Sequence, residues 1–198
     1  MKQLFLKNAM SLILEYHNNY SDEDIARLKY GLEGLYLTIT KLVIIILGSF
    51  LLGVGTEILL VLVFLNIIRF PAFGFHANSS KSCLIFSSLL IVGLPYLFLH
   101  ITIPTFMKYI LCGIALLCYI LYAPADTAKR PLLNKKKRFI RKIASICISL
   151  VYIYMAIWSQ NSTIATILLS SLLIEAIAIH PLTYRMFGQS YANYRNFL

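Results

Sequence analysis

The chain has 198 residues, of which 59% are hydrophobic and only 13% are charged, and its mean hydropathy is +0.77. These values exclude an ordinary soluble domain, in which about a quarter of the residues carry a charge. The length suffices for about six membrane-spanning helices of roughly 20 residues each and leaves no room for a second globular domain. We therefore expect an all-α, polytopic membrane bundle that forms a single domain over residues 1–198.

Residues 1–34 differ from the rest because apolar and charged side chains recur there at near-helical spacing. Ser21–Asp24 resembles a capping sequence at the start of a second helical piece. We expect two amphipathic helices on the cytoplasmic face, serving as a positive topology anchor or as a docking surface for an amphipathic peptide or a second copy. No small-residue cleavage site follows Met1–Tyr20, so we expect this stretch to be retained.

Apolar length and helix breakers together define six candidate spans within residues 35–180, followed by a cytoplasmic tail over residues 181–198. The second span is the weakest, because Glu57 and Arg69 bracket a short apolar run. The six are Leu35–Leu52, Ile58–Ile68, Leu84–Ile101, Phe106–Tyr122, Ile143–Trp158 and Ile164–Ile179.

The basic residues predict the orientation, because Lys and Arg accumulate on the cytoplasmic side of a membrane protein. With the N-terminus inside, Lys108 is the only cation assigned to the outer face. The protein should therefore be a multi-pass cell-membrane protein with both termini, the segment 69–83 and the segment 123–142 on the cytoplasmic side. The cations assigned to that side are Lys2, Lys7, Arg27, Lys29, Lys41, Arg69, Lys81, the Lys129–Lys142 cluster, Arg185 and Arg195.

The polar segment 69–83 interrupts the apolar spans and holds the most reactive side chains. Cys83 lies at the start of a predicted span, and both a helix N-terminus and neighbouring cations favour a thiolate. The other cysteines, Cys112, Cys118 and Cys147, lie among apolar residues inside spans and are expected to be structural.

A contact between His76 and Cys83 requires the segment to bend. On one continuous helix, seven residues place two side chains about 10 Å apart, which is too far for an ion pair. Pro71, Gly74 and Asn78–Ser80 supply the freedom to bend, and Ser80 or Ser82 could cap a helix that begins at Cys83. From the residues alone, a nucleophilic pair and a structural role both remain open. With only two soft ligands, no metal site or other cofactor is expected.

These residues resemble the motif of a known family. Arg69, Gly74, His76 and Cys83, with the run Gly74–Ala77, are similar to the motif of the accessory gene regulator protein B (AgrB) family. The run Tyr122–Pro131 resembles the segment after that family's fourth span, and the resemblance covers nearly the whole chain. One departure is Phe73, where many members carry a second glycine, and it affects the expected geometry of the loop.

The resemblance implies a membrane cysteine endopeptidase that processes an autoinducing peptide precursor in quorum sensing. Cys83 would be the nucleophile and His76 the base, so that an acidic C-terminal tail leaves and a thioester forms on Cys83. A cysteine of the precursor would then attack that thioester to give a cyclic thiolactone. Surrounding helices would keep water away from the intermediate.

Four further polar positions have open roles. Arg69 holds a substrate carboxylate, structures the loop or anchors the topology. Gly74 allows a tight turn and is compatible with an oxyanion donor. Asp126 orients His76 or is an ordinary turn carboxylate, and Glu175 should face the bundle interior or a partner because a carboxylate is expensive in lipid.

The basic segment that follows the fourth span has two readings. It is a topology determinant held against anionic lipid. The resemblance adds a receptor for the acidic tail of the precursor, formed by Lys129, Arg130, Lys135, Lys136 and Lys137. The expected partners are therefore the precursor peptide and membrane lipids, together with a second copy in a homodimer, whereas nucleic acid is not expected.

Two other functional classes compete with the peptidase. A peptide transporter or export component is compatible with the bundle and with Glu175, but the sequence shows no inverted repeat. A noncatalytic membrane scaffold is the third class. Loss of the Cys83 thiol would inactivate only the peptidase.

Overall fold

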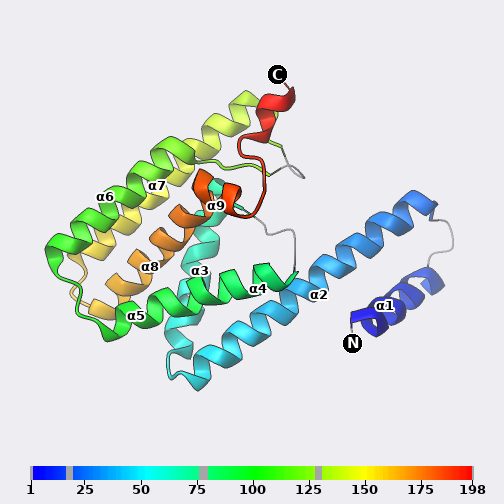
Figure 1. Cartoon of the computed structure of the whole chain (residues 1–198), viewed down its shortest axis with the longest axis horizontal. Coiled ribbons are helices and arrows are strands. Elements are labelled where there is room, and N and C mark those ends of the chain that lie inside the picture. The colour runs from blue at the N-terminus through cyan, green and yellow to red at the C-terminus, as the bar shows by residue number, and fades with distance from the viewer. Residues whose placement is uncertain (1, 17–19, 76–79, 128–130, 198) are drawn as a thin grey trace. The chain divides into compact units, whose positions relative to one another are not determined.

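The computed structural model describes residues 2–16, 20–75, 80–127 and 131–197 (Figure 1). The regular elements of the described chain are all helices, and the extended segments form one isolated parallel bridge, between Phe73 and Ala125. The expected all-α class is thus confirmed. The chain divides into two compact units, Met1–Gly48 and Ser49–Leu198.

The first unit contains α1 (Lys2–Tyr16) and most of α2 (Asp22–Leu51). Two contacts join α1 to α2, an ion pair between Lys2 and Glu33 and a ring contact between Phe5 and Tyr36 with centroids 5.2 Å apart. Because α2 is unbroken, the second amphipathic piece and the first predicted span form one continuous helix.

The start of α2 confirms the capping sequence. The Ser21 hydroxyl donates to the Asp24 carboxylate at 2.7 Å, and the Asp24 N–H donates back to the Ser21 hydroxyl at 3.3 Å. This reciprocal arrangement satisfies N–H groups that the first turn of a helix leaves unpaired.

The second unit holds the remaining helices. Asn134 and Asn161 begin two of them, since each side chain accepts a hydrogen bond from a backbone N–H of the first turn. The elements are α3 (Gly55–Ala72), α4 (Ser80–Ser88), the π-helical turn Leu89–Gly93, α5 (Leu94–His100), α6 (Thr105–Tyr122), α7 (Lys135–Trp158), α8 (Ser162–Ile179), α9 (Pro181–Met186) and the 3₁₀ helix Asn193–Phe197.

Five of the described helices, α2, α3, α6, α7 and α8, are long and apolar enough to cross a membrane, which makes this a multi-pass membrane protein. The predicted span Leu84–Ile101 is helical only over the shorter stretch Leu84–His100, within α4, the π-turn and α5. The expected start of that helix at Cys83 is also wrong, since α4 begins at Ser80.

The span expected to be weakest extends further than Ile58–Ile68. Helix α3 includes Glu57 in its first turn and Arg69 in its last turn. An anion at the N-terminus and a cation at the C-terminus both complement the helix dipole, so these charges lengthen the helix. Arg69 therefore belongs to α3.

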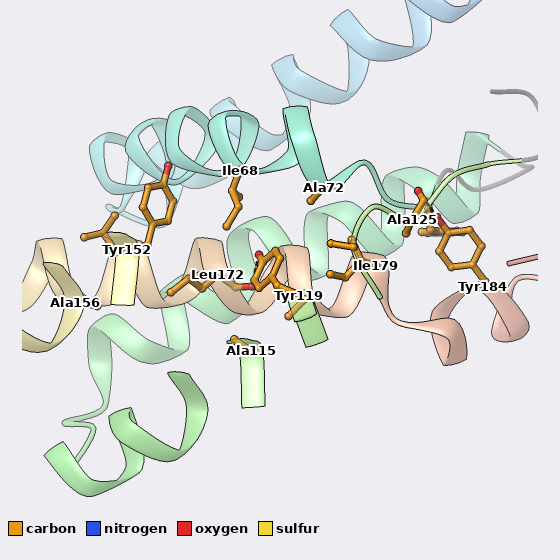
Figure 2. Packing of buried hydrophobic residues seen from close by; sticks show 14 residues of the cluster. Ile68, Ala72, Ala115, Tyr119, Ala125, Tyr152, Ala156, Leu172, Ile179 and Tyr184 are labelled. Carbon is orange, nitrogen blue, oxygen red and sulfur yellow. Dashed lines mark hydrogen bonds between the residues drawn. The ribbon is translucent and has the colours of Figure 1, made fainter. Parts of the chain in front are cut away.

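Helix α8 lies at the centre of the second unit. In its most apolar 18-residue window, 72% of the residues are buried, against 39% or less in the other four candidate spans. It packs against α3, α5, α6, α7 and α9. Figure 2 shows Leu172 and Ile179 of α8 in one cluster with Ile68 and Ala72 of α3 and Tyr119 of α6.

Two buried tyrosines tie the helices together through backbone carbonyls. The Tyr119 hydroxyl of α6 donates to the Leu172 carbonyl oxygen at 3.1 Å, and the Tyr152 hydroxyl of α7 donates to the Phe64 carbonyl oxygen at 3.0 Å. Buried hydroxyls require such partners, so each bond also restricts how the helices pack.

We expect Leu172→Ala to lower the free energy of unfolding by about 2–5 kcal/mol, because a fully buried leucine leaves a cavity in the cluster. Leu117→Ala is the control, since Leu117 lies on α6 and is 55% exposed. Unfolding in detergent micelles measures both. Equal losses would show that α8 is not the centre of the packing.

Candidate active site

The chain turns sharply over Phe73–Phe75, where α3 ends. The Phe73 N–H donates to the Arg69 carbonyl oxygen at 2.9 Å and closes the helix. Phe73 and Gly74 have φ angles of 64° and 130°, in the region that favours glycine. The described part of the segment therefore turns at Phe73 and Gly74, whereas Pro71 lies inside the last turn of α3. Asn78 and Ser79, which were also expected to supply the bend between His76 and Cys83, lie outside the described residues.

Two distant segments hold this turn through its backbone. Ala125 donates its N–H to the Ala72 carbonyl oxygen at 2.9 Å and accepts from the Gly74 N–H at 3.1 Å. The Phe75 N–H donates to the Ala178 carbonyl oxygen, near the end of α8, at 3.1 Å. Because the N–H groups of Gly74 and Phe75 are both occupied, neither is free to stabilise an oxyanion.

The Arg69 side chain braces the same turn. It is partly buried, and its Nη2 donates to the Phe75 carbonyl oxygen at 3.0 Å. Of the roles considered for Arg69, this contact supports the structuring of the loop. A guanidinium is suited to the task because it offers several donors in a fixed fork.

Gly74 lies directly against α8. A Cβ atom at this position would be 3.1 Å from Glu175 Oε1 and 3.5 Å from the Ala178 Cβ. The glycine is therefore needed both for its backbone conformation and for this close approach. The tight-turn role is supported, whereas the occupied N–H argues against Gly74 as an oxyanion donor.

An aromatic cluster packs α4 beside the turn. The Phe75 ring is 5.6 Å from the Phe86 ring of α4 and 4.5 Å from the Phe187 ring, measured between centroids. The Phe86 and Phe187 rings are 5.0 Å apart. Sequence reasoning missed this cluster, because Phe75, Phe86 and Phe187 lie in three separate segments and no local pattern shows that they meet.

The two predicted catalytic residues belong to the segments that this cluster joins. His76 lies outside the described residues and follows Phe75 directly in the chain. Cys83 lies in the first turn of α4, one turn before Phe86, and its side chain is also outside the described part. The N-terminus of a helix favours a thiolate, and the reactive thiol expected at Cys83 stays a prediction.

Asp126 has a structural task that leaves little capacity for orienting a histidine. Its buried carboxylate accepts three backbone N–H groups, from Leu132 at 3.2 Å, Asn193 at 2.8 Å and Tyr194 at 2.9 Å. A carboxylate with several such donors is strongly satisfied. Asp126 therefore joins the segment after α6 to the C-terminal segment.

Two tyrosines fix the segment that pairs with the turn. The Tyr184 hydroxyl donates to the Ala125 carbonyl oxygen at 3.1 Å, a contact near the end of the cluster in Figure 2, and the Tyr191 hydroxyl donates to the Tyr122 carbonyl oxygen at 2.9 Å. Burial raises the pKa of Tyr184 and raises that of Tyr191 to about 12. Both phenols therefore remain protonated donors at neutral pH.

The start of α7 concentrates positive charge. Lys135, Lys136 and Lys137 are exposed in its first turn, whereas Lys129 and Arg130 fall outside the described residues. Helix N-termini are electropositive, and no acidic residue occupies this first turn. Within the described ranges, the α7 cations form no ion pair. This end of the helix is thus suited to bind anions.

A pocket of about 280 Å³ adjoins this basic helix end. Arg138 and Lys142 line it from α7, and Arg195 lines it from the C-terminal segment. Arg138 stacks on the Tyr194 ring, 3.7 Å from its centroid. Sequence reasoning treated residues 181–198 as a tail and missed this pocket, because no local pattern shows that Arg195 returns to α7.

Arg141 connects α7 to the turn itself. Its Nη1 donates to the Phe70 carbonyl oxygen at 3.0 Å, and its guanidinium lies 4.3 Å from the centroid of the Phe73 ring. A cation over an aromatic face is attracted by about 0.5–1 kcal/mol at exposed sites. The basic helix and the turn are therefore in direct contact.

Comparison with known proteins yields one family. The profile of the family "Accessory gene regulator B" matches residues 6–179. An AgrB-like protein of Clostridium acetobutylicum is 30% identical over 192 residues, which cover 97% of this chain and 92% of the relative. An AgrB-like protein of Listeria monocytogenes is 26% identical over 194 residues, covering 97% and 95%. No solved structure matches the chain significantly.

We expect Gly74→Ala to destabilise the protein by about 1–3 kcal/mol, because alanine is strained at this φ and its Cβ would press on Glu175. Gly113→Ala is the matched control, since nothing lies within 4 Å of a Cβ at that position in α6. Thermal unfolding in detergent compares the two. Equal stability of both variants would contradict the close approach at Gly74.

Proposed function

The chain belongs to the accessory gene regulator B family, and from this premise we propose that it is a membrane cysteine endopeptidase. It cleaves the C-terminal tail from an autoinducing peptide precursor, with Cys83 as nucleophile and His76 as base. The observation that carries the proposal is the contact between Phe75 and Phe86, with ring centroids 5.6 Å apart. It joins the turn before His76 to the helix that bears Cys83.

In the first half-reaction, the Cys83 sulfur attacks the carbonyl carbon of the scissile peptide bond while His76 takes the thiol proton. The tetrahedral oxyanion then collapses and the C–N bond breaks. His76 returns the proton to the leaving nitrogen, so that the tail departs with a free amino group. The remaining part of the precursor is held as a thioester on Cys83.

In the second half-reaction, a cysteine thiol of the bound precursor attacks the thioester carbon. Its proton passes to His76 and then to the departing Cys83 thiolate. A new C–S bond replaces the old one, so the acyl energy is conserved in a thiolactone ring. The rings of Phe75, Phe86 and Phe187 border the segments involved and support the exclusion of water, which would otherwise hydrolyse the thioester.

Recognition of an acidic tail is proposed for the basic end of α7. Lys135, Lys136 and Lys137 present exposed charge there, and the pocket lined by Arg138, Lys142 and Arg195 extends it. Lys129 and Arg130 complete the receptor proposed from the sequence. Charge at a membrane surface concentrates an oppositely charged ligand and weakens with salt.

The proposal includes the expected topology and assembly. Both termini, the turn and the basic helix end lie on the cytoplasmic side, where the precursor is made. The protein forms a homodimer, and cross-linking in native membranes that recovered only monomer would argue against it. A peptide transporter remains the competing function, and the test of the catalytic pair distinguishes the two.

We expect Cys83→Ala and His76→Ala each to abolish release of the tail from a co-expressed cognate precursor, because they remove the nucleophile and the base. Mass spectrometry of the released peptide measures the outcome at matched membrane levels. Cys147→Ala, which removes an exposed cysteine of α7, is the control and should remain active. Tail release by Cys83→Ala would eliminate this nucleophile and favour the transporter or scaffold.

We expect replacement of Lys135, Lys136 and Lys137 by glutamate to raise the KM for the precursor about tenfold at low salt, since each exposed charge pair contributes roughly 0.2–1 kcal/mol. Titration of tail release against precursor concentration measures this change. Lys108→Glu serves as the control, because Lys108 is assigned to the outer face of the membrane, away from the proposed tail receptor. An unchanged KM, or one insensitive to salt, would refute the tail receptor.

A further inference from the structure

Glu175 is a buried carboxylate that the proposed reaction does not use. Its side chain in α8 is 0% exposed. Neither of its oxygens has a hydrogen-bond donor among the residues that the structure describes. An isolated carboxylate in such a place is costly, so buried charges are normally paired.

The Glu175 carboxylate lies against the turn Phe73–Phe75. Its Oε1 faces Gly74, at 3.1 Å from where a Cβ would stand, in the turn that precedes residue 76 by two positions. Two residues of extended chain span at most about 7 Å. Glu175 therefore lies beside the start of the segment that carries His76, the proposed general base, and not in a remote part of the bundle.

The titratable groups that interact electrostatically with Glu175 come from three other helices. Arg69 of α3 is the cation whose charge acts on Glu175, and the Glu175 carboxyl in turn acts on Tyr119 of α6 and Tyr184 of α9. The two phenols donate elsewhere, to the carbonyl oxygens of Leu172 and Ala125. Arg69 donates through Nη2 to Phe75, and a guanidinium carries five N–H donors in all. Arg69 is thus the cation suited to be the counterpart of Glu175.

We propose that Glu175 is a positioning residue for the catalytic pair, acting together with Arg69 on the turn Phe73–Phe75. Glu175 supports Gly74 and balances the charge of Arg69, while Arg69 holds the Phe75 carbonyl oxygen. The pair fixes the direction in which the chain leaves the bundle towards residue 76. This inference rests on the proposed function and adds a residue to its machinery.

A merely structural role is a weaker explanation. A buried carboxyl group without a hydrogen-bond donor lowers stability, so stability alone does not account for Glu175. Catalysis, by contrast, depends steeply on geometry, and a displacement of about 1 Å can reduce a rate about 100-fold. Glu175 and Arg69, beside the start of the segment that carries His76, would hold that geometry in the proposed mechanism.

Kinetics of tail release provide the first test. Glu175→Gln keeps the shape of the side chain and removes its charge, and we expect a 10- to 100-fold lower rate at saturating precursor with KM changed less than twofold. Glu175→Asp should recover part of the rate. In an Arg69→Gln background, Glu175→Gln should add less than a threefold loss, because the two residues act as one unit.

Ser170→Ala is the matched control. Ser170 is a buried polar residue of the same helix, and its hydroxyl also has no acceptor or donor within the described ranges. It lies five residues before Glu175, about 7.5 Å along the axis. The control should retain the full rate. A Glu175→Gln rate within twofold of the unaltered protein would overturn the proposal.

Thiol reactivity gives a second readout that needs no peptide. In a chain with Cys112, Cys118 and Cys147 replaced by serine, iodoacetamide alkylates Cys83 alone. We expect His76→Ala and Glu175→Gln both to slow alkylation by tenfold or more at neutral pH. If Glu175→Gln does not accumulate in membranes, Glu175→Asp takes its place with a smaller loss.

The results distinguish the positioning role of Glu175 from the proposed catalytic pair of His76 and Cys83. Slowing by His76→Ala but not by the Glu175 variants would overturn the positioning role and leave the peptidase intact. An alkylation rate that His76→Ala does not change would overturn the catalytic pair and the positioning role with it. Slowing by both changes, with Ser170→Ala unaffected, supports the inference.

Discussion

The hydrogen bonds that hold the turn Phe73–Phe75 are the constraint on which the candidate site depends. Ala125 pairs with both sides of the turn, and Ala178 accepts from its last amide. These contacts join three segments that are remote in sequence. Because these hydrogen bonds occupy the amides of Gly74 and Phe75, neither amide is available to a bound ligand.

Helix α8 makes this arrangement possible because it is central. It contacts the helices on several sides, so one helix presents Leu172 to the hydrophobic cluster, Glu175 to the turn and Ala178 to the Phe75 amide. These residues follow one another at intervals of three positions, on one side of the helix. Packing of the core and placement of the site are thus determined by the same surface of α8.

Features set by local chemistry were predictable from the sequence, whereas features set by long-range contacts were not. Apolar length identified the all-α class and the membrane-crossing helices, and the cost of a charge in lipid predicted that Glu175 would be buried. The second span was predicted to end at Ile68, because Arg69 was taken as its boundary. A cation at the C-terminus of a helix complements the helix dipole, and α3 therefore includes Arg69. Asp126 and Arg195 acquire their roles from contacts across more than 50 residues, which leave no local pattern. His76 and Cys83 remain a prediction.

Phe73 holds a backbone conformation that residues with a side chain rarely adopt. Its φ of 64° is combined with a ψ of −133°, outside the small left-handed region, and a residue held in such a sparsely populated region costs about 1–3 kcal/mol. The Phe73 ring lies 4.3 Å from the Arg141 guanidinium, and a contact of this kind returns about 0.5–1 kcal/mol. The contact with α7 therefore offsets only part of the strain at residue 73. Gly74 has no comparable compensation, because a Cβ there would lie 3.1 Å from Glu175 Oε1.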